Sequence, residues 1–116
     1  MKALIVGLSL VSVLAFQPDP VKKAEKNLPP VAHAGNDMAI TTKDFVQLDG
    51  TASVEPDGLI SRYHWSQVSG KPATIVNPHA AISAVEGITP GEYVFRLVVT
   101  DEKGSSSVDE VSLTMK

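Results

Sequence analysis

Gly91-Glu-Tyr-Val-Phe-Arg-Leu-Val-Val-Thr-Asp-Glu-Lys-Gly104 is the stretch that decides the fold. Successive side chains of an extended chain point to opposite faces. One face of this stretch carries Tyr93, Phe95, Leu97 and Val99, and the other carries Val94, Arg96, Val98 and Thr100. Such β-branched and aromatic residues favour strands. Because both faces are largely apolar, we expect one long strand in the middle of a sheet, closed by a turn over residues 101–104.

Further segments on both sides of this strand have the composition or the alternation of strands, and turn formers separate them. They cover residues 29–35, 38–41, 45–50, 60–68, 73–76, 81–88 and 106–115. Turn signals recur about every 8 to 12 residues, which is typical of a sandwich. The pattern predicts an all-β sandwich of about seven to eight strands.

The first 15 residues have the layout of a secretory signal peptide. Lys2 gives a positive start, residues 3–14 are apolar, and Val13 and Ala15 fit cleavage after Ala15. The apolar run is shorter than the roughly 18–20 residues of a membrane span, and an uncleaved N-terminal anchor is the alternative. Residues 16–28 are polar and contain proline, which indicates a flexible linker. We expect a single domain over residues 29–116, secreted, periplasmic or at the cell surface, with no stable membrane span after cleavage.

Charge and cysteine content exclude several classes of protein. From Pro29 onward the chain has six Lys and Arg against eleven Asp and Glu, a net charge of −5. Without a basic patch, nucleic acid is excluded as a partner and anionic membranes are disfavoured. The chain has no cysteine, which excludes disulfides, thiol catalysis and thiolate zinc sites.

Three runs of the sequence together resemble a PKD (polycystic kidney disease) domain. They are PPVAHAG (29–35), VQLDGTASVEPDGLISRYHWSQVSG (46–70) and GITPGEYVFRLVVTDEKGSSS (87–107). The subtype is similar to the tandem PKD repeats of dyslexia-associated receptor-like proteins and to PKD domains of bacterial secreted proteins. The resemblance extends over residues 29–115. It implies an immunoglobulin-like β-sandwich in a family used for adhesion, spacing and ligand contact outside the cell.

Two aromatic residues fit such a sandwich on physical grounds. Trp65 has the position of the tryptophan that sandwiches of this kind bury on their third strand. Tyr93 precedes Phe95 by two residues, which matches the tyrosine-corner position, with Phe95 where an antibody domain has a cysteine. We expect the ring of Phe95 to fill the space of the missing disulfide.

The same resemblance implies a candidate calcium site. Some PKD domains of secreted bacterial enzymes bind Ca²⁺ between the N-terminal segment, an acidic loop and the end of the long strand. The matching residues are Asn27, Glu55, Asp57 and Asp101. Carboxylate and amide oxygens suit this ion. Glu55 departs from the family, which usually has Asp there, and the alternative is that Asp57 and Asp101 are turn formers. No cofactor is otherwise expected.

Patterns of catalysis are missing from the sequence. It contains no GxSxG elbow, no phosphate-binding glycine loop and no HExxH pair, so we expect no enzyme. His33, His64 and His79 do not have the sequence spacing of a metal-ligand motif, and His64 is expected to be a solvated strand residue.

The remaining function classes are binding and support. We expect an extracellular module for protein binding or adhesion, with loops or an edge strand contacting a partner at the cell surface. A structural spacer is one alternative, and an accessory module for polysaccharide is another. A polysaccharide-binding module needs a row of exposed aromatic rings. Strand periodicity predicts that Phe45 is the only exposed aromatic residue of the domain.

Overall fold

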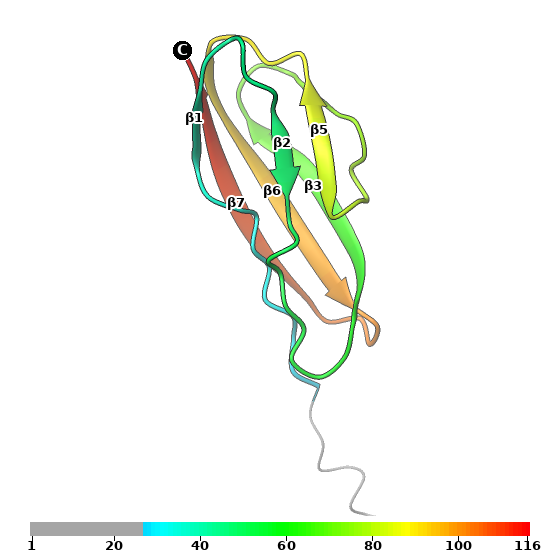
Figure 1. The fold of residues 1–116 in the computed structure, drawn as a ribbon. Coiled ribbons are helices and arrows are strands. Elements are labelled where there is room, and N and C mark those ends of the chain that lie inside the picture. The colour runs from blue at the N-terminus through cyan, green and yellow to red at the C-terminus, as the bar shows by residue number, and fades with distance from the viewer. Residues whose placement is uncertain (1–26) are drawn as a thin grey trace, which may run out of the picture.

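The structure, a computed structural model, describes residues 27–116, which form a sandwich of two β-sheets (Figure 1). The predicted signal peptide and most of the predicted linker lie outside the described residues. The seven strands are β1 (Met38–Ile40), β2 (Gln47–Asp49), β3 (Ile60–Ser69), β4 (Thr74–Ile75), β5 (Ile82–Glu86), β6 (Gly91–Asp101) and β7 (Ser106–Met115). The predicted all-β sandwich is confirmed.

One sheet has four strands in the order β1-β7-β6-β3, and the other has three in the order β2-β5-β4. The long strand β6 lies between β7 and β3 and is antiparallel to both, as its two apolar faces predicted. At the outer edge, β1 is parallel to β7, with Met38 opposite Leu113. The long strands β3, β6 and β7 run along the sandwich, and the β2–β3 and β6–β7 connections lie at the end opposite the C-terminus (Figure 1).

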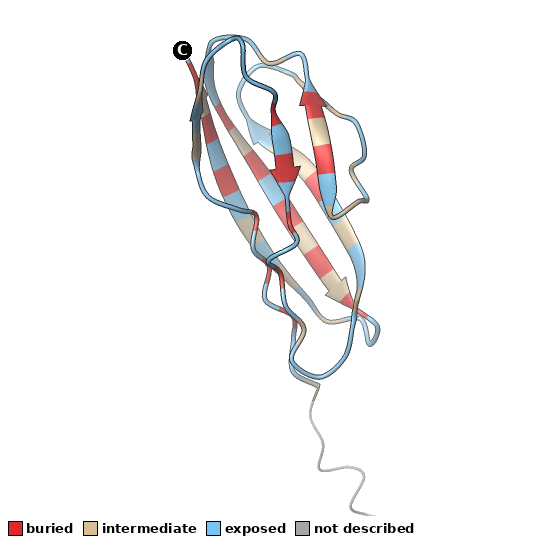
Figure 2. Ribbon diagram, in the orientation of Figure 1, coloured by how far each residue is buried: buried red, intermediate tan, exposed pale blue. Residues whose placement is uncertain are grey.

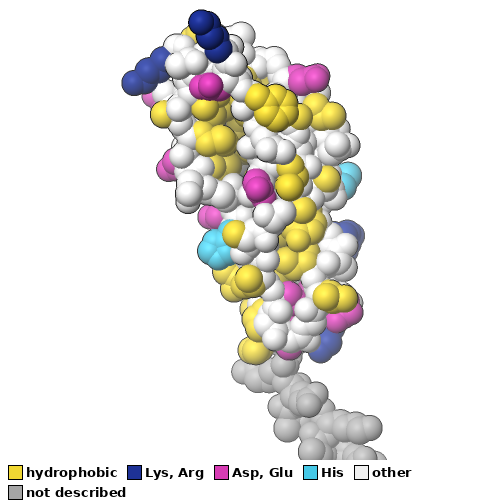
Figure 3. Space-filling model, viewed as in Figure 1, with side chains coloured by type: hydrophobic (Ala, Val, Ile, Leu, Met, Phe, Trp, Pro, Cys, Tyr) yellow, Lys and Arg dark blue, Asp and Glu magenta, His cyan; other side chains and the backbone are white. Residues whose placement is uncertain are grey.

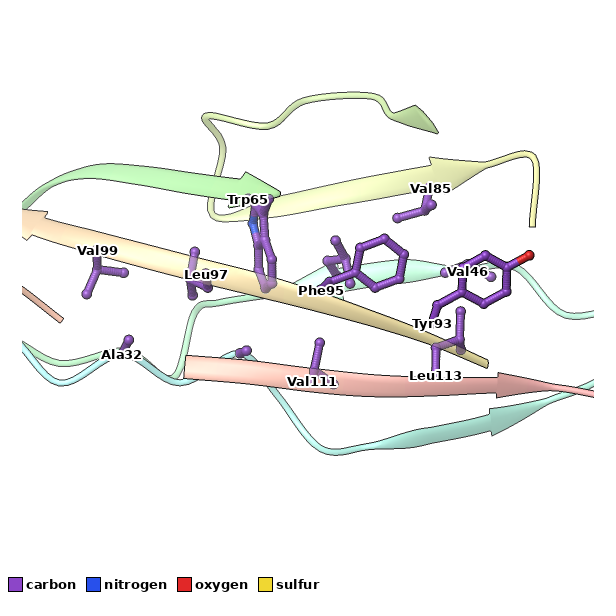
Figure 4. Packing of buried hydrophobic residues seen from close by; sticks show 12 residues of the cluster. Ala32, Val46, Trp65, Val85, Tyr93, Phe95, Leu97, Val99, Val111 and Leu113 are labelled. Carbon is purple, nitrogen blue, oxygen red and sulfur yellow. The ribbon is translucent and has the colours of Figure 1, made fainter. Parts of the chain in front are cut away.

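The core consists of the side chains that face inward from both sheets (Figure 4). The alternate residues of β6 that the sequence placed on one face are fully buried: Tyr93, Phe95, Leu97 and Val99. Val111 and Leu113 of the neighbouring strand β7 lie beside them, and Leu48 of β2 packs from the opposite sheet. The red bands on alternate residues of these strands in Figure 2 show this periodicity directly. Burial of these aliphatic and aromatic groups is the main stabilising contribution to the fold.

The two aromatic positions singled out in the sequence are confirmed. Trp65 is 1% exposed, and its indole Nε1 donates a hydrogen bond to the carbonyl of Ala80 (3.0 Å). The Tyr93 hydroxyl accepts a hydrogen bond from the Thr89 amide and donates one to the Thr89 carbonyl, both 2.9 Å long. This is the backward hydrogen bonding of a tyrosine corner. Phe95, fully buried beside Tyr93, fills the centre of the sandwich.

Residues 29–35 form a single β-bridge, between Val31 and Val54, and no strand. Prolines at 29 and 30 have no amide hydrogen, which disfavours a regular ladder. Side chains satisfy the next amides: Ala32 donates to Ser107 Oγ and Ala34 donates to Asp109 Oδ2, each at 2.7 Å. The segment is therefore fixed along β7 by polar side chains of that strand.

Within residues 27–116, no helix is long and apolar enough to cross a membrane.

Candidate metal centre

The fold brings the four predicted calcium ligands to one end of the sandwich. Asn27 is the first described residue, Glu55 and Asp57 lie in the connection between β2 and β3, and Asp101 is the last residue of β6. One carboxylate oxygen from each of Glu55, Asp57 and Asp101 can be chosen so that all three lie within 4.8 Å of one another. We call these three residues the acidic cluster, and the end that carries them the acidic end.

Asp101 anchors the acidic cluster in the β6–β7 hairpin. Its side chain is 2% exposed. Oδ1 accepts hydrogen bonds from the amides of Lys103 and Ser105, each 2.9 Å long, and Oδ2 accepts one from the side-chain amide of Asn27, also 2.9 Å. The Asn27 amide and these backbone donors hold the pKa of Asp101 below its ordinary value. Asp101 is therefore an ionised carboxylate that also stabilises the turn between β6 and β7. A role in forming the turn is compatible with a role as a metal ligand.

The N-terminal segment is tied to the acidic cluster by two more hydrogen bonds. Nδ2 of Asn27 donates to Ser105 Oγ (2.7 Å), and the amide of Leu28 donates to Asp57 Oδ2 (2.9 Å). Asn27 and Leu28 therefore contact both the β6–β7 hairpin and the β2–β3 connection. Three separate parts of the chain meet at this point.

The pKa values of Glu55 and Asp57 are shifted in opposite directions. The side-chain hydrogen bond with Asp57 raises the pKa of Glu55, and its own burial and the nearby Asp101 charge act in the same direction. The same hydrogen bond with Glu55, followed by the one from the Leu28 amide, lowers the pKa of Asp57. Carboxylates this close repel when both are ionised, so one retains a proton more easily. A bound cation would relieve this repulsion.

Two buried oxygens among the described residues have no hydrogen-bond donor: Asn27 Oδ1 and Glu55 Oε1. Buried polar atoms normally have partners, and each one without a partner costs free energy. A hard cation such as Ca²⁺ takes carboxylate and amide oxygens as ligands. The donor set and the two unpaired oxygens therefore fit this ion, and Glu55 reaches the cluster despite its longer side chain.

Glu102 is a further carboxylate at the acidic end that the sequence reasoning missed. A Cβ atom built on Gly58 would lie 2.6 Å from Oε1 of Glu102 and 3.8 Å from Oε2 of Glu55. The side chain of Glu102 therefore reaches over Gly58 toward the acidic cluster. Its position directly after Asp101 was the available signal, but the direction of its side chain depends on the path of the hairpin.

The aromatic residues lie as the sequence predicted, with one refinement. Trp65 and Tyr93 are buried, and Tyr63 is partly buried and packs against the core. Phe45 is 74% exposed. A flat surface that binds polysaccharide needs a row of exposed aromatic rings, and the described residues contain no such row.

Comparison with known proteins identifies the family. The family described as "K319L-like, PKD domain" matches residues 34–115. This chain is a member of that PKD family. The human dyslexia-associated protein KIAA0319 is 38% identical over 98 residues, covering 83% of this chain and 9% of its own length. Collagenase ColQ1 of Bacillus cereus (strain Q1) is 34% identical over 74 residues, covering 64% of this chain and 7% of its own length.

A solved structure supports the same fold. The PKD domain of the KIAA 1837 protein, solved in solution, superposes with a TM-score of 0.68 at 29% identity, covering 80% of this chain and 92% of that domain. The chain spans less than a tenth of the length of the two curated relatives, so it corresponds to one module of much larger proteins. PKD domains of this type occur both in receptor-like proteins and in bacterial secreted proteins.

Proposed function

We propose that this PKD domain is a non-catalytic extracellular module that binds a protein partner through its acidic end, and that Ca²⁺ holds that end in shape. The observation that carries the proposal is the meeting of three chain segments at the acidic cluster, with two unpaired buried oxygens. The family supports the setting, because its relatives include receptor-like proteins and a collagenase.

Four residues would hold the ion: Asn27 through its side-chain oxygen, and Glu55, Asp57 and Asp101 through carboxylates. When bound, Ca²⁺ supplies positive charge that neutralises the acidic cluster and adds ligand bonds. The protein's own contribution is to fix Asp101 in the hairpin and Asp57 against the Leu28 amide. The N-terminal segment thereby keeps a defined direction relative to the sandwich.

The acidic end also exposes aliphatic side chains. Leu28 is 50%, Val31 46%, Val54 53% and Leu59 71% exposed. Val31 and Val54 are paired in the isolated bridge, and Leu59 follows the β2–β3 turn. Figure 3 shows hydrophobic and acidic surface side by side at the end of the sandwich opposite the C-terminus. Apolar groups surrounded by polar surface are typical of protein-binding sites.

Sheet edges offer less to a partner than this end does. β1, β2 and β4 have only two or three residues each. β3 is longer, but in its middle the Trp65 amide already donates to the carbonyl of Pro78 (2.7 Å). Strand addition needs a run of free backbone groups. Contact through loops therefore fits the molecule better than contact through an edge strand.

A capture experiment with the immobilised full chain tests the proposal. Cell-surface protein extract and insoluble polysaccharide are passed over it separately, first with Ca²⁺ and then with chelator. We expect a protein to be retained in Ca²⁺ and released by chelator. The Leu59→Ser variant should lose most of this retention. Phe45→Ser is the matched control because Phe45 is equally exposed but lies in the β1–β2 connection at the opposite end (Figure 1).

Other outcomes would replace the proposal. Retention of polysaccharide alone would favour the accessory carbohydrate role, and no retention of either material would favour the spacer role. If Leu59→Ser and Phe45→Ser reduce the amount of retained protein equally, the acidic end is not the contact surface.

A further inference from the structure

Two histidines that are far apart in the sequence lie side by side on the surface. His64 is in β3, and His79 is in the connection between β4 and β5. Their ring centroids are 4.9 Å apart, and the ring planes are tilted by 49°. Both residues are exposed. The predicted exposure of His64 is confirmed, and its contact with His79 depends on the path of the loop between β4 and β5.

The backbones that carry the two rings are held together by Trp65. The amide of Trp65, next to His64, donates to the carbonyl of Pro78 (2.7 Å), next to His79. The indole of Trp65 donates to the carbonyl of Ala80 on the other side of His79 (3.0 Å). Since Trp65 is itself 1% exposed in the core, both segments are fixed to the rigid interior. The two imidazoles are therefore brought together before any ligand arrives, which reduces the entropic cost of binding.

The spacing of the rings matches that of two imidazoles on one metal ion. With metal–nitrogen bonds of about 2.1 Å and angles between about 90° and 110° at the metal, two such rings have centroids about 4.6–5.3 Å apart. We propose that His64 and His79 form a binding site for one divalent transition-metal ion such as Zn²⁺, Ni²⁺ or Cu²⁺. Imidazole suits these ions, whereas Ca²⁺ and Mg²⁺ prefer oxygen. Water fills the other coordination positions, which stay open to a ligand from a partner.

This site is separate from the acidic end. His64 pairs with Val98 in the sheet, whereas Asp101 pairs with Ile60, four residues along β3. At about 3.3 Å per residue, this offset is about 13 Å. Arg62 lies two residues before His64 on the same strand face, so the local charge does not attract cations. Affinity therefore rests on the two nitrogen ligands, and the inference does not depend on the calcium proposal.

The test uses the full chain in excess Ca²⁺, so that the acidic end is not available to the added metal. Zn²⁺ is titrated calorimetrically, and Cu²⁺ is titrated against the fluorescence of Trp65, the single tryptophan of the chain. We expect one ion per chain, with quenching of Trp65 by Cu²⁺. His64→Gln and His79→Gln should each weaken binding by roughly a hundredfold, because the chelate is lost.

His33→Gln is the matched control. His33 is also exposed, but it lies in the N-terminal segment, where its amide donates to Ser53 Oγ. This variant should bind Zn²⁺ and Cu²⁺ as the unaltered chain does. Circular dichroism melts in chelator check that all three variants are folded. Wild-type affinity in either His64→Gln or His79→Gln would overturn the proposal, and so would an equal loss in His33→Gln.

Discussion

Gly70 combines a backbone conformation and a position that other residues do not tolerate. Its φ is +101°, and an added Cβ would lie 2.6 Å from the Glu92 carbonyl oxygen and 2.8 Å from the Tyr93 ring. Gly87 also has a positive φ, +83°, but nothing lies within 4 Å of an added Cβ. Alanine at Gly87 would therefore introduce only backbone strain, whereas alanine at Gly70 would add steric clashes with Glu92 and Tyr93.

We expect Gly87→Ala to destabilise the domain by about 1–2 kcal/mol, the cost of a left-handed conformation. Gly70→Ala should cost about 1–3 kcal/mol more, because the neighbouring backbone must move. Denaturant unfolding of both variants measures the difference. Equal free energies of unfolding would mean that β3 and β6 are not packed at Gly70 as described.

The tyrosine corner makes a second prediction at the scale of one residue. Tyr93→Phe removes a hydroxyl that both accepts from and donates to the Thr89 backbone. We expect a loss of about 1–3 kcal/mol, because the amide and carbonyl of Thr89 lose their hydrogen-bond partner. Tyr63→Phe is the control, because Tyr63 is a partly buried tyrosine of β3 that packs against the core outside the tyrosine corner. If both variants unfold with the same free energy, the Tyr93 hydrogen bonds contribute little.

At the scale of strands and loops, alternation in the sequence located the strands closely. Alternation placed Phe95 and Leu97 on one face of a central strand, and the structure shows that this face is the buried one. The meeting of Asn27 with Asp101 followed from the family resemblance. The approach of Glu102 to Gly58, and of His79 to His64, depends on loop paths that no periodicity encodes. Residues 29–35 formed a bridge instead of a strand because side chains of β7 satisfied their amides.

The β2–β3 loop carries a prediction about charge. Glu55→Gln removes one of the repelling carboxylates of the acidic cluster. Without Ca²⁺ the variant should therefore melt at a higher temperature than the unaltered chain, and addition of Ca²⁺ should raise its melting temperature much less. Glu86→Gln, an exposed substitution in β5, is the control and should change neither value. A calcium response of Glu55→Gln equal to that of the unaltered chain would exclude Glu55 as a ligand.

The pKa shifts at this loop predict how the calcium response depends on pH. The raised pKa of Glu55 means that its proton is retained above the ordinary value of 4.5 and is lost as the pH rises further. Because Ca²⁺ binds the ionised carboxylate, its affinity should increase as the pH rises through this range. In chelator, the lowered pKa of Asp101 contributes stability above its ordinary value of 3.8, and this contribution is lost as the pH falls through its folded value.

Calorimetric Ca²⁺ titrations at a series of pH values from 4.5 to 7 check the first part, and melts in chelator below pH 4.5 check the second. An affinity for Ca²⁺ that does not change across the upper range would contradict the assignment of Glu55.

For the whole molecule, two sheets enclose one core, and the two ends of the sandwich differ in chemistry. The acidic end gathers the N-terminal segment, the β2–β3 loop and the β6–β7 hairpin, and the opposite end carries the C-terminus (Figure 1). In the human dyslexia-associated protein KIAA0319, the matched segment is only 9% of the length, so a module of this kind is joined to other parts of the chain. A cation at the acidic end would hold the N-terminal segment, the β2–β3 loop and the β6–β7 hairpin together.

Calcium binding at the acidic end is tested by the melting temperature of the full chain in Ca²⁺ and in chelator, together with a calorimetric Ca²⁺ titration. We expect one Ca²⁺ per chain. At a concentration 100 times the dissociation constant, binding should add about 2.7 kcal/mol of stability. For a domain of this size that is roughly 10 °C or more in melting temperature. Asp57→Asn should lose most of this gain. If no heat of binding is detected and the melting temperatures in Ca²⁺ and in chelator are identical, the acidic end does not bind calcium.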